Sequence, residues 1–243
     1  MQTPDPRHAP PIPAYLRETY PWAYLTPRAV RVFERQWLVN LILWGHFARL
    51  RDAALDALAP ALGGQVLQVA CVYGDLTPRL VQRLAPGGHV AVVDVALIQL
   101  GNLARKLQAL GPTPPSRESV GAGPVSLHCQ DSVALSWPDA SQDAVLLFFL
   151  LHEQPEDVRR RTLAQAWRVL RPGGRLVVVD YHRPAAWHPA RWLMGAVLRW
   201  LEPFAWDLWR HPVAHWLPPE ARPSAVECRT WFGGLYQRVV FTR

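Results

Sequence analysis

The chain has few cysteines and no long apolar segment, and each scarcity excludes a class of protein. Only three cysteines occur among 243 residues, Cys71, Cys129 and Cys228, and none has CxxC spacing. Scattered single cysteines favour a reducing compartment, here the cytoplasm, and argue against a structural zinc site. The longest uncharged apolar stretch, 37–45, is interrupted by Asn40 and is too short to span a bilayer. We therefore expect neither disulfides nor a transmembrane helix.

The sequence also lacks the apolar core of a signal peptide near its start. Residues 1–14 are rich in proline and are expected to form a disordered lead. Composition and patterning divide the rest into four parts: a helical cap over 15–60, an α/β core over 61–184, Trp- and Arg-rich helices over 185–221, and closing strands over 222–243.

Residues 65–75 connect a predicted strand to a predicted helix, and the rest of the chain is organised around them. Val66 and Val69 belong to a short apolar run that predicts a buried strand. Asp75 or Thr77 is suited to cap the helix that follows. A strand that turns into a helix in this way brings backbone N–H groups to the edge of a parallel sheet, where nucleotides bind.

This turn resembles motif I of the class I S-adenosylmethionine (SAM) methyltransferases, but most of its glycines are absent. Gln68 stands where an acid is usual, Ala70 replaces the first glycine and Val72 the second, and only Gly74 is kept. Val72 and Tyr73 place side chains where glycines normally let the cofactor approach the backbone. The resemblance implies that this loop binds SAM, with the amino-acid end of SAM displaced from its ordinary position.

Strands and helices then alternate, which predicts a doubly wound, Rossmann-like α/β sheet of the class I methyltransferase type. Further strands are expected over 89–95, 125–129, 144–150 and 175–180, with a closing hairpin over 226–241. The segment from Val169 to Asp180 is a strong signature of the same family.

The resemblance assigns further SAM contacts to residues that follow the second and third strands. Asp94, with its neighbour Val95, is placed at the ribose hydroxyls, because a carboxylate ends the second strand there. Asp131, with its neighbour Ser132, is placed at the adenine amino group. An aspartate that only stabilises a turn is the alternative for Asp131.

Polar side chains follow the strands expected at 144–150 and 175–180. His152 and Glu153 follow the first of them, and Asp180 and His182 lie at the end of the second. Because the carboxyl ends of parallel strands meet at one edge, these four side chains are a candidate ligand set for a divalent metal such as Mn²⁺. A general base at His152, and a metal-free site with a structural Asp180, are the alternatives.

Tryptophan and arginine are combined to an unusual degree, with 12 tryptophans and a formal charge of +7. In the helices expected over 185–221, Trp and Arg alternate, which suits helices that frame the entrance for a lipid substrate at a membrane surface. Four aromatic residues are expected to contact such a substrate: Tyr24, Trp37, Trp44 and Tyr181. Nucleic acid is not expected as a partner, because the arginines are spread over all helices and no binding module is visible.

Several segments narrow the resemblance to the RquA family, the methyltransferase-like enzymes of rhodoquinone biosynthesis. They are residues 20–24, 33–45, 66–79 with the sequence Val-Tyr-Gly-Asp at 72–75, and 231–236. The resemblance implies that a ring methoxy group of ubiquinone is replaced by an amino group, that SAM is the amino donor and that Mn²⁺ is required. The resemblance also implies that the protein acts at the inner-membrane surface. Whether it forms a homo-oligomer is left open.

The reaction needs the amino nitrogen of SAM, rather than its methyl group, to face the quinone ring. The bulk of Val72 and Tyr73 is a plausible device for this, and Tyr73, Asp75 and His152 are the expected catalytic residues. Two alternatives are kept: a conventional SAM-dependent quinone or lipid methyltransferase with a degenerate motif I, and a quinone-binding methyltransferase-like protein without catalysis.

Overall fold

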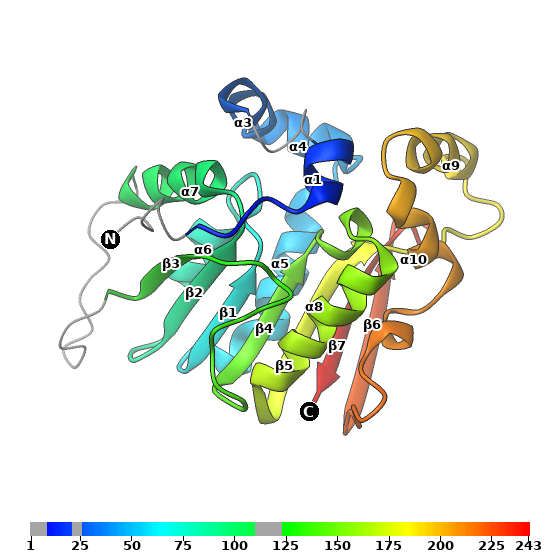
Figure 1. Cartoon of the computed structure of the whole chain (residues 1–243). Helices are drawn as coiled ribbons and strands as arrows, with labels where there is room; N and C mark the ends of the chain where they lie inside the picture. The colour runs from blue at the N-terminus through cyan, green and yellow to red at the C-terminus, as the bar shows by residue number, and fades with distance from the viewer. Residues whose placement is uncertain (1–8, 21–25, 110–122) are drawn as a thin grey trace.

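The computed structural model describes residues 9–20, 26–109 and 123–243 of the chain. Its described part contains one sheet of seven strands in the order β3-β2-β1-β4-β5-β7-β6 (Figure 1). The strands are β1 (Gln65–Val69), β2 (His89–Asp94), β3 (Val125–Cys129), β4 (Gln142–Phe148), β5 (Leu170–Tyr181), β6 (Ala225–Trp231) and β7 (Tyr236–Thr242). Neighbours among β1 to β5 run parallel, while β7 is antiparallel to both β5 and β6. The predicted fold class is confirmed.

Helices cover the sheet and extend beyond its carboxyl edge. They are α1 (Ala14–Thr19), α3 (Pro27–Phe33), α4 (Gln36–Ile42), α5 (Phe47–Leu58), α6 (Leu76–Gln82), α7 (Leu97–Ala109), α8 (Glu156–Val169), α9 (Arg191–Trp200) and α10 (Trp206–Arg210). Four short 3-10 turns join them: η2 (Ala59–Ala61), η3 (Leu151–Glu153), η4 (Pro203–Ala205) and η5 (Val213–Trp216). Figure 1 shows α8 in front of the sheet and α5 behind it, so both faces are covered.

The central strands are buried on both faces, as their unbroken apolar runs predict. Val66, Val145 and Val178 are fully buried, and so are Leu50 and Leu55 on the inner face of α5. Burying such side chains is the main force that holds this sheet together, at about 25 cal/mol for each Å² of apolar area removed from water.

Within the expected helical cap, residues 27–58 form three separate helices, α3, α4 and α5. α3 ends at Phe33 and α4 at Ile42, and the backbone then turns through Trp44 and Gly45, which both have positive φ (52° and 76°). This break lets α3 and α4 lie above the carboxyl edge of the sheet while α5 packs behind it (Figure 1). Among the described residues, no helix is both long and apolar enough to cross a bilayer.

Candidate functional site

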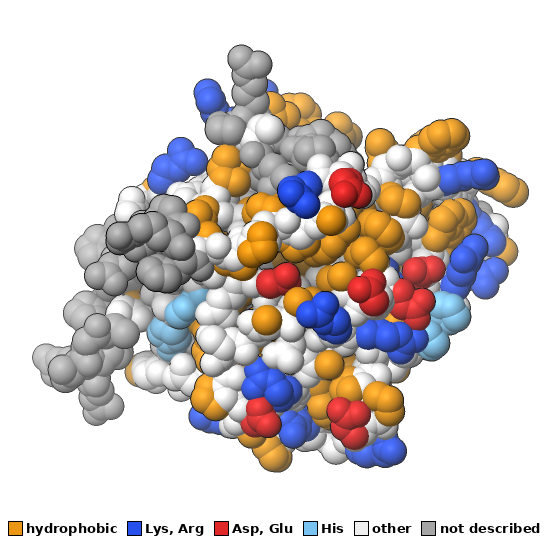
Figure 2. All heavy atoms as spheres, viewed as in Figure 1, with side chains coloured by type: hydrophobic (Ala, Val, Ile, Leu, Met, Phe, Trp, Pro, Cys, Tyr) orange, Lys and Arg blue, Asp and Glu red, His pale blue; other side chains and the backbone are white. Residues whose placement is uncertain are grey.

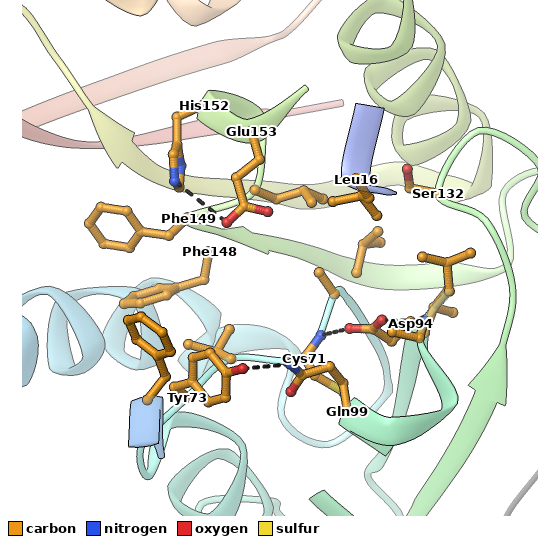
Figure 3. A pocket seen from close by; sticks show the side chains of 18 of the residues that line it. Leu16, Cys71, Tyr73, Asp94, Gln99, Ser132, Phe148, Phe149, His152 and Glu153 are labelled. Atoms are coloured by element: carbon orange, nitrogen blue, oxygen red, sulfur yellow. Dashed lines mark hydrogen bonds and ion pairs between the residues drawn. The ribbon is translucent and has the colours of Figure 1, made fainter. Parts of the chain in front are cut away.

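A cavity opens at the carboxyl edge of the sheet, between the ends of β1, β2 and β4. It has a volume of about 200 Å³. Figure 3 shows Tyr73, Gln99 and Asp94 on one side of it and His152 and Glu153 on the other. Leu16 of α1 projects between the two sides, so the N-terminal helix closes part of the cavity. Most of the lining is apolar or aromatic, which is typical of sites for small organic ligands.

The loop after β1 forms one wall of this cavity. Ala70, Val72 and Tyr73 all line it, with Cys71 between them. The backbone at Ala70 has a φ of 73°, a left-handed conformation that glycine adopts without strain and alanine does not. The loop thus keeps the backbone path that a glycine-rich turn favours while carrying side chains along it.

Gly74 lies behind this wall and is not a lining residue, contrary to its expected role in cofactor binding. Its φ is 85°, and a Cβ atom at this position would lie 2.8 Å from Cζ of Phe47. Glycine is therefore required by the close approach of the Phe47 ring. The one glycine that motif I keeps is explained by packing.

Gln68 also lies outside the cavity, which corrects its expected role in cofactor binding. Its side chain is fully buried; Nε2 donates to the Ala70 carbonyl at 2.9 Å, and Oε1 accepts from the Thr77 hydroxyl at 2.9 Å. These bonds tie β1 to α6 and support the left-handed turn at Ala70. The amide is suited to this because it donates and accepts at once.

Asp94 joins the end of β2 to the motif I loop. Its carboxylate accepts from the backbone N–H of Cys71 at 2.7 Å and from that of Ala96 at 2.8 Å. Burial raises the pKa of Asp94 to about 6, although the two backbone N–H groups oppose the rise. Asp94 and its neighbour Val95 line the cavity, so the carboxylate is placed to accept hydrogen bonds from a diol.

Asp131 and Ser132 line the same cavity at the end of β3. Oδ1 of Asp131 accepts from the backbone N–H of Val133 at 3.1 Å, which is the turn-stabilising role. Ser132 is held by the Thr162 hydroxyl at 2.8 Å and by Nε2 of Gln154 at 3.2 Å. Asp131 therefore stabilises the turn and still lies at the cavity wall.

Tyr73 is held firmly in its position at the cavity wall. Nε2 of Gln99, on α7, donates to its hydroxyl at 2.7 Å, and its ring stacks on Phe33 with centroids 5.9 Å apart. Burial raises the pKa of the Tyr73 hydroxyl above its ordinary value, so the phenol is neutral. Nothing in the sequence singles out Gln99, because a polar residue in a helix is ordinarily exposed.

Two charged residues that the sequence analysis missed hold the backbone of the loop. Nζ of Lys106 donates to the Gly74 carbonyl at 2.8 Å and to Oε1 of Glu34 at 2.8 Å. The backbone N–H of Gly74 donates to the same Glu34 oxygen at 3.2 Å, and Nδ2 of Asn102 donates to the other oxygen. Glu34 and Lys106 come from α3–α4 and α7, so only the fold brings them to the loop.

Asp75 faces away from the cavity, contrary to its expected catalytic role. Its carboxylate forms an ion pair of 2.7 Å with Arg51 and another with Arg79, and it does not line the cavity. Burial would raise its pKa, but hydrogen bonds from Arg79 and Arg51 outweigh that effect and lower the pKa of Asp75. A carboxylate bound by two guanidinium groups is a poor proton acceptor.

His152 is the centre of an acidic cluster on the opposite wall. Nδ1 lies 3.0 Å from Oδ1 of Asp180, and Nε2 lies 3.7 Å from Oε1 of Glu153 and 4.0 Å from Oε2 of Glu202. Burial opposes a charged imidazole, but the carboxylates of Asp180, Glu202 and Glu153 together outweigh it and raise the pKa of His152 to about 9. At neutral pH His152 is therefore a proton donor, and a catalytic role for it stays a prediction.

Glu202, which the sequence analysis missed, completes this cluster from the segment after α9. Burial raises the pKa of Glu202, while His152 and a hydrogen bond from Tyr20 oppose the rise. Glu202 lines the cavity, as does Glu153. It lies 50 positions from His152 in a segment without a motif, so no spacing in the sequence could have revealed it.

Three of the four expected metal ligands, His152, Glu153 and Asp180, lie together, but His182 does not join them. Asp180 accepts from the backbone N–H groups of Leu151 and Tyr181 and also faces Nδ1 of His152. Nδ1 of His182 is directed at the Gly234 carbonyl, at 2.7 Å. In the described ranges, no group of three or more His, Cys, Asp or Glu side chains could hold a metal ion. The requirement for Mn²⁺ stays a prediction, without ligands assigned to it.

The residues expected at the substrate fall into three groups. Tyr181 lines the cavity, where its ring meets His152 edge-on with centroids 5.0 Å apart. Trp37 and Trp44 are 61% and 41% exposed and lie outside the cavity. Tyr24 lies outside the described residues.

Phe149 adds to the aromatic wall at Tyr181 and was not anticipated. Its φ is 51°, in the left-handed region, and its ring meets those of Tyr181 and Tyr236 edge-on at 5.5 and 5.9 Å. Strained backbone at the end of a strand is common at functional sites. Phe149 and Tyr181 line the cavity together with His152, so this wall combines aromatic rings with a charged imidazole.

The chain is similar in sequence to known methyltransferases. A family model described as a methyltransferase domain matches residues 66–174. A demethylmenaquinone methyltransferase from Thermus thermophilus is 32% identical over 147 residues, 60% of this chain and 60% of that protein. The ubiquinone/menaquinone biosynthesis C-methyltransferase UbiE of Pasteurella multocida is 29% identical over 147 residues, 60% of this chain and 50% of its own. The chain thus matches about half to three fifths of these relatives' length.

Solved structures agree on the fold. A SAM-dependent methyltransferase from Aquifex aeolicus superposes with a TM-score of 0.54 at 18% identity, over 89% of this chain and 97% of that one. The [4+2]-cyclase SpnF superposes with a TM-score of 0.53 at 19% identity, over 76% and 60%. The chain therefore has the Rossmann-like α/β fold that these SAM-dependent methyltransferases share.

Proposed function

We propose that this chain converts ubiquinone to rhodoquinone by replacing a ring methoxy group with an amino group taken from SAM. The observation that carries the proposal is the motif I loop, in which Val72 and Tyr73 line the cavity and Tyr73 is held by Gln99 and Phe33. A side chain fixed on both sides does not move aside for a cofactor. The side chains of Val72 and Tyr73 therefore determine where a ligand can lie in the cavity.

The residues present fit a nucleoside cofactor. Asp94 offers a carboxylate to a ribose diol, and Asp131 and Ser132 offer polar atoms where an adenine edge would lie. SAM, when bound, supplies the α-amino nitrogen that the ring gains. Val72 and Tyr73 exclude its amino-acid end from the usual path along the loop, and this is how the chain would turn the nitrogen toward the ring.

The opposite wall fits a quinone ring and the proton transfers of the exchange. The rings of Phe149 and Tyr181 provide flat apolar surface for a lipophilic quinone. His152, protonated at neutral pH because Asp180 holds it, can donate a proton from Nε2 to a departing methoxide or to a quinone oxygen. Glu202, whose pKa is raised by burial, is the better proton acceptor for the incoming amine.

A methoxy carbon on a quinone is a vinylogous ester carbon, so it is open to addition of an amine followed by loss of methoxide. The bond between Cα and nitrogen of the attached SAM must then break by elimination, in which a proton is removed from Cβ and the aminoquinone departs. This chemistry needs a positioned nucleophile, a proton acceptor and a proton donor. The chain's own residues can supply the last two, as described above. We assign no step to a metal ion, because no ligand set for one can be named.

The second candidate is C-methylation of a quinone ring, and the relatives favour it. Both cited relatives are named as quinone methyltransferases. The fold alone does not decide between the two candidates, since one structural neighbour is a [4+2]-cyclase. A lipophilic quinone as substrate is common to both candidates, and with it we propose that the chain acts at the cytoplasmic face of the inner membrane.

Isotope labels separate the candidates. The purified chain is incubated with ubiquinone and SAM that carries ¹⁵N at the α-amino group and ¹³C in the methyl group, with and without Mn²⁺. We expect ¹⁵N in the quinone product together with loss of one methoxy group. Gain of ¹³C would establish the methyltransferase instead, and unchanged quinone that still binds the chain would indicate a carrier without catalysis.

A further inference from the structure

The surface of α9 exposes large apolar side chains to a degree that is unusual for a soluble domain. Trp192 is 88% exposed, Trp200 80% and Trp187, in the preceding segment, 76%. Leu193 and Leu201, next to Trp192 and Trp200 in the sequence, are each more than half exposed. Figure 2 shows these hydrophobic side chains gathered with basic ones over α9, at the upper right. A contiguous apolar patch of this kind marks a docking surface.

A groove lined by arginines lies beside these tryptophans, between α9, α10 and the segment before α9. Its volume is about 1010 Å³, and Arg183, Arg191, Arg199 and Arg210 line it together with Trp192 and Trp200. No acidic side chain lines it. Within the described part of the chain, none of the four arginines has an acidic partner at ion-pair distance. The groove therefore carries uncompensated positive charge.

We propose that this groove binds the phosphate groups of anionic phospholipids and that Trp192 and Trp200 enter the interfacial region of the bilayer. Arginine suits phosphate because its guanidinium donates two parallel hydrogen bonds. The indole ring of tryptophan is apolar with one N–H donor, and it is enriched at the level of lipid headgroups. α9 has only 10 residues, so it lies in the plane of the interface and does not span it.

A second apolar surface, on α4, continues this docking surface toward the cavity. Trp37 and Leu41 are 61% and 66% exposed there. Ile42 is 43% exposed and also lines the cavity, so it joins the outer surface to the site. Figure 1 places α4 and α9 both beyond the carboxyl ends of the strands. A bilayer resting on both would meet the cavity at its apolar mouth.

This inference deepens the membrane location in the proposed function, but its test does not depend on turnover. The full chain is mixed with vesicles of phosphatidylcholine alone or of phosphatidylcholine with phosphatidylglycerol, and binding is measured by flotation. We expect binding to the anionic vesicles that weakens as salt is added. The double variant Arg191→Gln/Arg199→Gln should lose about fivefold in affinity for each arginine removed. The double variant Trp192→Ser/Trp200→Ser should reduce binding to the anionic vesicles more than the double arginine variant does.

A matched control removes the same charge elsewhere. Arg161→Gln/Arg222→Gln changes two arginines outside the groove and should bind nearly as the unchanged chain does. Equal binding to neutral and anionic vesicles, or an equal loss in the control variant, would overturn the proposal. So would a nucleic-acid duplex that competes as well as anionic vesicles do, or a dimer that dissociates when Trp192 and Trp200 are replaced. Thermal unfolding of each variant shows that the fold is kept.

Discussion

The side-chain amide of Gln99 on α7 donates a 2.7 Å hydrogen bond to the hydroxyl of Tyr73 in the loop after β1. The loop is thus connected to the helix that follows the next strand. The Tyr73 ring cannot leave the cavity wall without breaking this bond and the stack on Phe33. Tyr73, which stands between the replaced glycine at Val72 and the kept Gly74, is thus a fixed part of the site.

Removing this bulk should change the chemistry more than the binding. We expect Tyr73→Gly to lower ¹⁵N incorporation by at least about a hundredfold, because positioning of the reacting group contributes several kcal/mol. SAM affinity, measured by calorimetry, should change by less than about tenfold. Tyr73→Phe keeps the ring and loses the bond from Gln99, so it should retain most activity. Equal activity in Tyr73→Gly and the unchanged chain would contradict the proposed role of the loop.

The stability of the protein should depend on pH through His152. Its folded-state pKa of about 9 lies above the ordinary 6.5, so its contribution is fully present below pH 6.5 and is lost as pH rises to about 9. The free energy of unfolding should fall across that window by on the order of 2–3 kcal/mol relative to His152→Gln. Urea titrations at several pH values measure this. If the free energy of unfolding varied with pH in the same way in the unchanged chain and in His152→Gln, the pairing with Asp180 would not raise the pKa of His152.

Glycine at position 70 should stabilise the chain. The backbone of Ala70 has a φ of 73°, where a Cβ atom costs about 1 kcal/mol that glycine does not incur. We expect Ala70→Gly to raise the free energy of unfolding by a similar amount. The control is Ala48→Gly in α5, an exposed helical site, which should lower it by about 1 kcal/mol. A loss of stability in both variants would show that Ala70 is not strained.

The Lys106 ammonium should contribute measurably to the order of the motif I loop. Lys106→Met removes the bonds to the Gly74 carbonyl and to Glu34, and charged hydrogen bonds of this kind contribute about 1.5–3 kcal/mol each. We expect lower stability and faster hydrogen exchange at the amides of residues 72–74. Arg105→Met, at the neighbouring position, loses only a 3.3 Å bond to Asn102 and serves as the control. Equal exchange rates in the two variants would contradict a role for Lys106 in ordering the loop.

SAM affinity should depend on the ionisation of Asp94. Its pKa of about 6 means that the carboxylate is charged at pH 7.5 and largely protonated at pH 5. A protonated carboxyl is a weaker acceptor for a diol, so SAM should bind more weakly as pH falls through about 6. The Asp94→Asn variant should bind SAM weakly at both pH 5 and pH 7.5. Calorimetry at pH 5 and 7.5 tests this, and a pH-independent affinity in the unchanged chain would exclude Asp94 as the ribose acceptor.

Sequence patterns alone determined the sheet, because strand periods and turn chemistry are local. The expected strand 125–129 agrees with β3 residue for residue, and the closing hairpin was anticipated as β6 and β7. The carboxylate at the end of β2 follows from the same local logic. Motif resemblance placed Ala70, Val72, Tyr73, Asp94 and Asp131, all of which line the cavity.

Tertiary structure decided which polar groups are left for chemistry. Asp75 is neutralised by Arg51 and Arg79, Gln68 is occupied by internal hydrogen bonds, and Asp180 is held by backbone donors and by His152. Glu202, by contrast, reaches His152 from a distant segment. Hydrogen bonds and ion pairs between residues far apart in the chain have no period and no motif. Only the folded chain shows which carboxylates already have partners and which still face the cavity.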